Sequence, residues 1–159
     1  MLTESITHEC SCDSDDRQTG TVTEQIARVV CDFQRESTGH CPKAVSVVLS
    51  EDMLVVTLHE ALTTGERALS RNSDGAANVQ EFHRQLFASA SGSLLREINR
   101  ITGRQVREAT AQVGPTTGAI VHAFTTGTMV QIFLLIPDTP VNNCGRRNPE
   151  RGQQEEETQ

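Results

Sequence analysis

Residues 44–59 read AVSVVLSEDMLVVTLH, and this stretch decides the fold class. Two runs rich in β-branched residues, Ala44–Leu49 and Met53–His59, predict strands. Only Ser50–Asp52 lies between them, a loop so short that the two strands must form a hairpin. The sequence therefore predicts an antiparallel strand pair here.

Helical patterns precede and follow this hairpin in the sequence. From Thr21 onward apolar residues recur at the helical interval, and Gly39 ends the run, which predicts an amphipathic helix of about four turns. After the hairpin, Thr63 and Glu66 stand at the spacing of a capping box, in which each side chain bonds the backbone N–H of the other. A short helix is therefore expected from Thr63 to about Arg71.

A long apolar stripe predicts one further helix that ends at Gly103. Gly92 is its weak point, because glycine in a helix interior costs about 1 kcal/mol relative to alanine. The stripe, which we expect to face the core, consists of Val79, Phe82, Leu86, Ala90, Leu94, Ile98 and Ile101.

Later segments add strands. Residues 119–125 are predicted as a strand or a short helix, and Met129–Ile136 as a buried strand. The order of elements predicts an α+β domain of two layers over residues 19–141. Its antiparallel or mixed sheet of about four to five strands would carry the long helix and the N-terminal helix on one face.

Both ends of the chain differ from this body in composition. Residues 1–18 carry a net charge of −4 and residues 142–159 a net charge of −1, and both segments are polar and poor in branched aliphatic residues. Such segments cannot bury enough apolar surface to offset their ordering entropy, so both are expected to be disordered tails. The start lacks the basic and apolar regions of a secretory signal, and no apolar run approaches the roughly 18 residues of a membrane span. We expect a soluble cytoplasmic protein, peripheral to a membrane only through a partner.

The five cysteines are odd in number and form no repeated C-x-x-C pair, so no disulfide framework is predicted. Cys31 and Cys41 are expected as small buried hydrophobic residues. The segment His8-x-Cys10-x-Cys12-Asp13 groups residue types that bind metals. A closed zinc site normally takes four ligands from two separated segments, and no second segment has a usual spacing. We expect neither a metal nor another cofactor.

Composition and motifs exclude several functions. The net charge of −7 and the aromatic content of 3% argue against a nucleic-acid partner, because phosphates require cations and bases stack on aromatic rings. The sequence contains no G-x-S-x-G, Walker, dinucleotide-binding or H-E-x-x-H motif. His59, His83 and His122 are isolated, with no carboxylate or nucleophile that the sequence can place beside them, so structural roles are expected. No catalytic residue is predicted, and the chain is not expected to be an enzyme.

One segment is a weak candidate for anion binding. Thr116, Thr117 and Gly118 combine a glycine with hydroxyl groups, which can form a backbone nest for a small oxyanion such as bicarbonate or phosphate. A plain turn between strands is the favoured interpretation, because a nest requires dihedral angles that sequence does not reveal.

The order and spacing of five short motifs over about residues 20–138 resemble the MpsC family. These motifs are Gly39-x-x-Pro42-Lys43, Glu51-Asp52-Met53, Leu62-Thr63-x-x-Glu66, Ile101-Thr102-Gly103 and Thr116-Thr117-Gly118. The resemblance implies a soluble component of a sodium-translocating, membrane-potential-generating system that is linked to uptake of dissolved inorganic carbon. No catalytic residue is established in that family, so none is transferred.

This resemblance implies an accessory or regulatory protein that acts by protein–protein binding. Its candidate partner surface is formed by loop residues that match the family and are not obviously core: Gly39, Pro42, Lys43, Glu51 and Asp52. A membrane protein is the expected partner, without direct lipid binding, and a homodimer is a further candidate assembly. The alternative is a sensor domain that binds a small ligand and dimerises through its apolar strand edge or its long helix.

Overall fold

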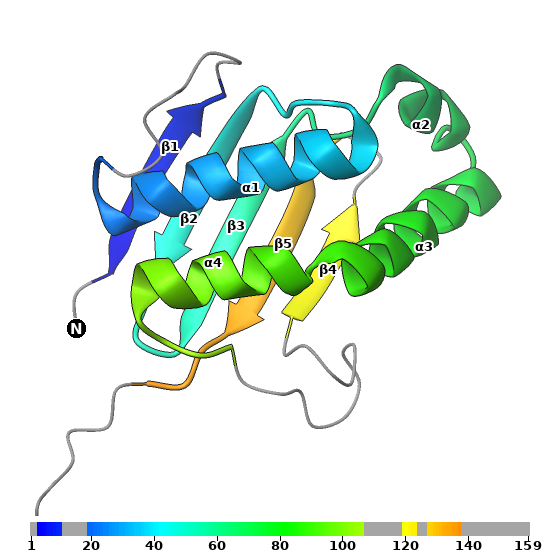
Figure 1. Ribbon diagram of the computed structural model, residues 1–159. Helices are drawn as coiled ribbons and strands as arrows, with labels where there is room; N and C mark the ends of the chain where they lie inside the picture. Colours follow the sequence, from blue (N-terminus) through cyan, green and yellow to red (C-terminus); the bar gives the residue numbers. More distant parts are fainter. Residues whose placement is uncertain (1–2, 11–18, 107–118, 124–126, 138–159) are drawn as a thin grey trace, which may run out of the picture.

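The computed structural model of the protein describes residues 3–10, 19–106, 119–123 and 127–137. These residues form a sheet and four helices (Figure 1). The strands are β1 (Glu4–Glu9), β2 (Ala44–Leu49), β3 (Met53–His59), β4 (Ala119–Ala123) and β5 (Met129–Leu134). The helices are α1 (Val22–Thr38), α2 (Thr64–Leu69), α3 (Ser73–Ala90) and α4 (Gly92–Thr102).

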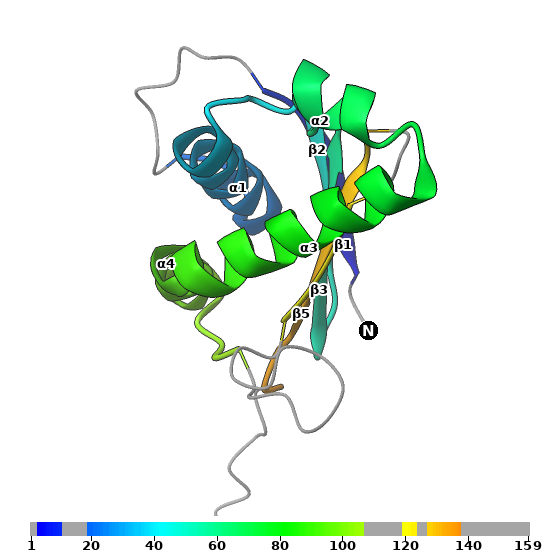
Figure 2. The ribbon, with the colours of Figure 1, turned by 90° about the vertical axis from the view of Figure 1, so that its right-hand side faces the viewer.

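All five strands join one antiparallel sheet in the order β1-β2-β3-β5-β4. The predicted hairpin is confirmed, with Val47 opposite Val56 and Leu49 opposite Leu54. Helices α1 and α4 and the C-terminal part of α3 lie on the same side of the sheet, as the edge-on view in Figure 2 shows. The predicted α+β fold of two layers is therefore confirmed.

The core fills the space between the sheet and these helices. Alternate residues of β2 and β3 point into it, which is the two-residue period of a half-buried strand. Three phenylalanines span the layers, because Phe87 of α3 lies 6.0 Å from Phe33 of α1 and 5.9 Å from Phe133 of β5 between ring centroids. Other fully buried side chains include Ile26, Val30, Val45, Leu54, Leu58, Leu62, Leu94, Ile98 and Met129.

Helix ends follow the local signals in the sequence. Thr21 caps α1 in a capping box with Glu24, and Gly39 ends the helix with a φ of 74°, a left-handed conformation that favours glycine. The predicted capping box of Thr63 and Glu66 is confirmed at the start of α2. That helix ends at Leu69, slightly before the predicted position.

The prediction of one long helix is wrong, because the segment breaks at Ser91 into α3 and α4. The break lies beside Gly92, where the helix is intrinsically weakest. It lets α3 pack near β4 while α4 packs against α1. The predicted stripe also fails at Phe82, which is 50% exposed. In α3 the buried positions are Gly75, Val79, His83 and Phe87, at intervals of four residues.

The predicted N-terminal tail is wrong for residues 4–9, which form the edge strand β1 on β2. Edge pairing relies on backbone hydrogen bonds, so it needs little apolar sequence, and Ile6 is the apolar residue that β1 packs against the core. A disulfide joins Cys10, just after β1, to Cys31 of α1. The prediction of Cys31 as a buried hydrophobic residue is therefore wrong, whereas Cys41 is half-buried. Residues 11–18 and 142–159 lie outside the described part of the chain.

Strand β5 is buried on one face only. Met129, Gln131 and Phe133 point into the core, whereas the residues between them are partly exposed, so the expected fully buried strand is wrong. The segment at 119–123 is a strand, which settles the choice between strand and helix. Within the described ranges, none of the helices has the length and apolar character needed to cross a membrane.

Candidate functional site

The predicted partner surface does not form one patch. Gly39, Pro42 and Lys43 precede β2, whereas Glu51 and Asp52 follow it. The strand has six residues, which separates the two groups by roughly 20 Å at about 3.3 Å per residue. The prediction that these residues cluster is therefore wrong, because a strand carries its two flanking loops to opposite ends of the sheet.

Each of the two groups has a structural role. Pro42 is buried, and Lys43 Nζ lies 3.4 Å from Glu60 Oε1 in an exposed ion pair of little energetic weight. At the hairpin tip, Arg104 Nη1 donates to the carbonyl oxygen of Ser50 at 2.9 Å, and the amide of Leu135 donates to that of Asp52 at 2.8 Å. These two hydrogen bonds hold the hairpin tip through its backbone carbonyl groups. The candidate nest at Thr116, Thr117 and Gly118 lies outside the described residues.

A hollow of about 540 Å³ lies between the last turn of α1, helix α2 and helix α3. We call it the α2–α3 pocket. Its polar lining is Ser37, Thr38, Thr63, Glu66 and Asn78, and its apolar lining is Leu69, Val79 and Phe82. No local sequence signal predicts this pocket, because its walls come from three helices.

A carboxylate–histidine contact lies at this pocket. Glu66 Oε2 accepts from the amide of Thr63 at 2.7 Å, and Glu66 Oε1 lies 2.8 Å from His83 Nε2. The side chain of His83 is 2% exposed and that of Glu66 is 16% exposed. One carboxylate therefore completes the capping box of α2 and connects α2 to α3. His83, which the sequence presented as isolated, has a carboxylate beside it.

Burial lowers the pKa of His83 below its usual range, and the negative charge of Glu66 opposes this shift without cancelling it. At neutral pH the ring is therefore neutral. The buried ring is not among the residues that line the pocket, so it is poorly placed to take a proton from a molecule there. The contact joins α2 to α3, and its carboxylate places a negative charge at the pocket.

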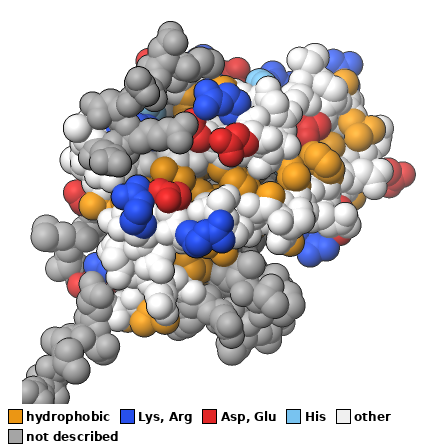
Figure 3. Space-filling view, viewed as in Figure 1, with side chains coloured by type: hydrophobic (Ala, Val, Ile, Leu, Met, Phe, Trp, Pro, Cys, Tyr) orange, Lys and Arg blue, Asp and Glu red, His pale blue; other side chains and the backbone are white. Residues whose placement is uncertain are grey.

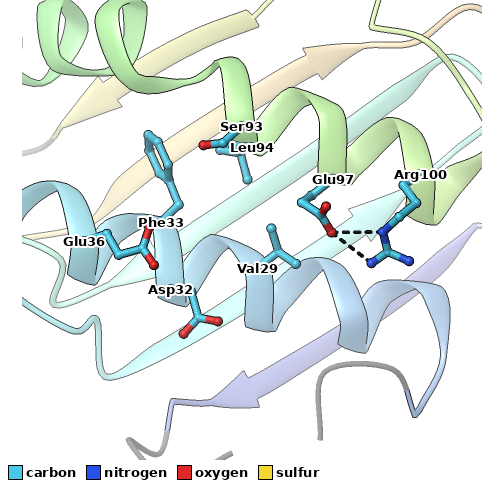
Figure 4. A pocket seen from close by; sticks show the side chains of 8 residues that line it. All are labelled: Val29, Asp32, Phe33, Glu36, Ser93, Leu94, Glu97 and Arg100. Carbon is cyan, nitrogen blue, oxygen red and sulfur yellow. Dashed lines mark hydrogen bonds and ion pairs between the residues drawn. The ribbon is translucent and has the colours of Figure 1, made fainter. Parts of the chain in front are cut away.

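A second hollow lies between α1 and α4 and measures about 160 Å³ (Figure 4). It is lined by Val29, Asp32, Phe33, Glu36, Ser93, Leu94, Glu97 and Arg100. Arg100 bonds Glu97 of the same helix, with Nη2 and Oε2 2.9 Å apart. Charged side chains of both signs gather over these two helices (Figure 3). Because ligand pockets usually measure about 300–1,000 Å³, this groove is small for a ligand.

The face of the sheet opposite α1, α3 and α4 carries an apolar patch. We call it the open face and define it by Val48, Met53, Val55, Val130, Ile132 and Leu134. Val55 stands between Val48 and Ile132 in register, and Met53 is opposite Leu134, so the six residues are contiguous. Val48 is 37% exposed and Met53 39% exposed.

Polar residues of β1, β2 and β3 border this patch. Thr7 Oγ1 and Ser46 Oγ are 3.0 Å apart, and Ser46 Oγ is also 3.0 Å from His59 Nε2. The open face therefore combines an apolar centre with a polar border, which is the general composition of a protein interface.

The described residues contain no group of three or more His, Cys, Asp or Glu side chains that could hold a metal ion. Cys10, a member of the N-terminal segment with metal-binding residue types, is bonded to Cys31. Its sulfur is therefore not a thiolate, the form that binds zinc.

One protein family matches most of this architecture. The model of the family described as "Na+-translocating membrane potential-generating system (MpsC)" matches residues 18–128, from α1 through β4. The chain belongs to the MpsC family. The resemblance inferred from the five motifs is thereby confirmed, and β1 and β5 of this MpsC protein lie outside the matched range. No protein of curated function and no solved structure matched the chain.

Proposed function

We propose that this MpsC protein is an accessory or regulatory subunit that acts by protein–protein binding, with the open face as its binding surface. The partner would be another protein of the sodium-translocating, membrane-potential-generating system after which the family is described. The observation that carries the proposal is the contiguous apolar patch on the sheet face opposite α1, α3 and α4.

The open face has an appropriate size for such a role. The sheet face of β1, β2, β3 and β5, which includes the open face and its polar border, is about 20 Å wide and about 20 Å long, or roughly 400 Å² in projection. Side-chain relief makes the accessible area larger. The smaller specific interfaces bury about 600 Å² per partner, so this face can supply most of one side of an interface.

A protein is favoured over lipid as the membrane-side partner. The chain carries a net charge of −7, and anionic headgroups repel such a protein. Apolar residues at the centre of the open face instead suit a partner that presents its own apolar surface. Association with a membrane would then require a protein in that membrane.

Binding is favoured over catalysis by the state of the carboxylate–histidine contact. The imidazole of His83 is buried against Glu66 and does not line the pocket, so it is poorly placed to accept a proton from a molecule there. A role in binding uses the open face and needs no such group.

The test compares two double variants with the same charge change. Val48→Lys with Met53→Lys places two cations on the open face, and Gln85→Lys with Ser89→Lys places two on the exposed side of α3. Each folded variant, checked by circular dichroism, is sedimented with native membranes and with protein-free anionic vesicles. We expect the parent and the α3 variant to co-sediment with native membranes, the open-face variant to remain in solution, and the parent not to sediment with vesicles.

Two results would contradict this function. A folded open-face variant that sediments as the parent does would show that another surface binds the partner. Tight sedimentation of the parent with protein-free vesicles would show direct lipid binding. Charge reversal of Lys43 alone and of Glu51 with Asp52 alone then tests the two ends of β2 separately.

A further inference from the structure

The α2–α3 pocket is a separate feature, because none of the residues that line it belongs to the open face. Its volume of about 540 Å³ falls within the usual range for small-molecule sites. All six residues of α2 are at least partly exposed, so this helix forms a wall of the pocket and contributes no buried residue to the core.

The charges around the pocket favour a cation. Among the described residues that line it, Glu66 is the one with a formal charge. Each carboxylate oxygen has two lone pairs, and the contacts of Glu66 with Thr63 and His83 occupy at most one on each oxygen, so acceptor capacity remains. Ser37 and Thr38 belong to the last turn of the 17-residue helix α1, whose C-terminal end carries partial negative charge.

Apolar side chains form the other wall. Leu69 and Phe82 are each 50% exposed, and Val79 is buried beside them. The ring of Phe82 offers a face that attracts cations through its quadrupole. A ligand that satisfies both walls needs a positive charge and an apolar body.

We propose that the α2–α3 pocket binds a small organic ammonium ion with an apolar body. The ammonium group donates hydrogen bonds to the carboxylate of Glu66 and to hydroxyl groups of the lining, and the apolar body lies against Leu69, Val79 and Phe82. This site goes beyond the proposed function, since it needs no protein partner and uses no residue of the open face.

The test titrates the full chain with three probes of similar shape and different charge. These are 2-phenylethylammonium, neutral 2-phenylethanol and anionic 3-phenylpropionate, followed by calorimetry and by amide chemical shifts. We expect the ammonium probe to bind at least about tenfold more tightly than the alcohol, the anion not to bind, and the shifts to map to α2, α3 and the last turn of α1.

Matched variants locate the charge. Glu66→Gln removes the charge but keeps the capping box, because glutamine also closes it. We expect this variant to lose at least about tenfold in affinity for the ammonium probe. Glu97→Gln, which removes the same charge from α4, is expected to bind as the parent does. Phe82→Ala alters an exposed side chain, so it should fold and also bind more weakly.

Several results would overturn the site. Absence of binding by the ammonium probe at millimolar concentration would do so, as would equal affinity for the ammonium and alcohol probes. Parent-like affinity in folded Glu66→Gln would show that the carboxylate does not select the ligand. Should Glu66→Gln fail to fold, unchanged affinity in Phe82→Ala would likewise overturn the proposal.

Discussion

Opening the disulfide between Cys10 and Cys31 tests how β1 is anchored. Cys10 directly follows β1 and Cys31 lies in α1, with a sequence separation of 21 residues. A crosslink that closes a loop of this length lowers the entropy of the unfolded chain, which corresponds to about 3 kcal/mol of stability. Reduction, or Cys31→Ser, should therefore lower the free energy of unfolding by about 3 kcal/mol.

Urea unfolding followed by circular dichroism, with and without dithiothreitol, measures this difference. For a chain of this size about 1 kcal/mol corresponds to roughly 2–4 °C, so the melting temperature should fall by roughly 6–12 °C on reduction. Cys41→Ser is the control, because Cys41 is not part of the Cys10–Cys31 disulfide and its variant should respond to reduction as the parent does. Cys31→Ser should not respond to the reductant.

A change in the free energy of unfolding of less than about 0.5 kcal/mol on reduction, the range of ordinary surface changes, would contradict this role of the disulfide. Peptide mapping of the oxidised protein gives an independent check. A map in which Cys10 and Cys31 are not linked would refute the anchoring of β1 through this bond.

Three further predictions test the core, the buried histidine and the chain ends. Leu94→Ala should cost roughly 2–5 kcal/mol in urea unfolding because Leu94 is buried, and a cost below about 0.5 kcal/mol would contradict its place in the core. Because burial lowers the pKa of His83, the unfolded chain binds a proton at this residue more readily than the folded protein does. Stability measured by urea unfolding should therefore decrease as the pH falls below about 6.5, and this decrease should be smaller in His83→Gln. Deletion of residues 1–10 should lower the melting temperature because it removes β1, whereas the polar composition of residues 142–159 predicts little change when they are deleted.

The fold was predictable where neighbouring residues carry the signal. The hairpin of β2 and β3 follows from two β-branched runs and a short loop, and the capping box of Thr63 and Glu66 follows from a spacing of three residues. Strand β1 was missed because an edge strand is held by backbone bonds that leave little mark on the choice of side chains.

The candidate sites were far less predictable. The capping box identified Glu66, but its contact with His83 joins two helices that are brought together only by packing. The loop residues Lys43 and Glu51 looked like one surface because they are close in sequence, and the intervening strand places them at opposite ends of the sheet. The open face was not predicted because Met129–Ile136 was expected to be a buried strand, whereas β5 is buried on one face only.

The sequence by itself determined the local elements, the α+β class and the family motifs, because periodicity, capping and turn chemistry act over a few neighbouring residues. Only the tertiary structure decided which elements share a face, where the long helix breaks and which side chains meet. Those outcomes depend on the packing of segments distant in the chain, such as Phe33, Phe87 and Phe133 in one core. The α2–α3 pocket and the open face both arise from such packing, since one is enclosed by three helices and the other is the side of the sheet that α1, α3 and α4 do not cover.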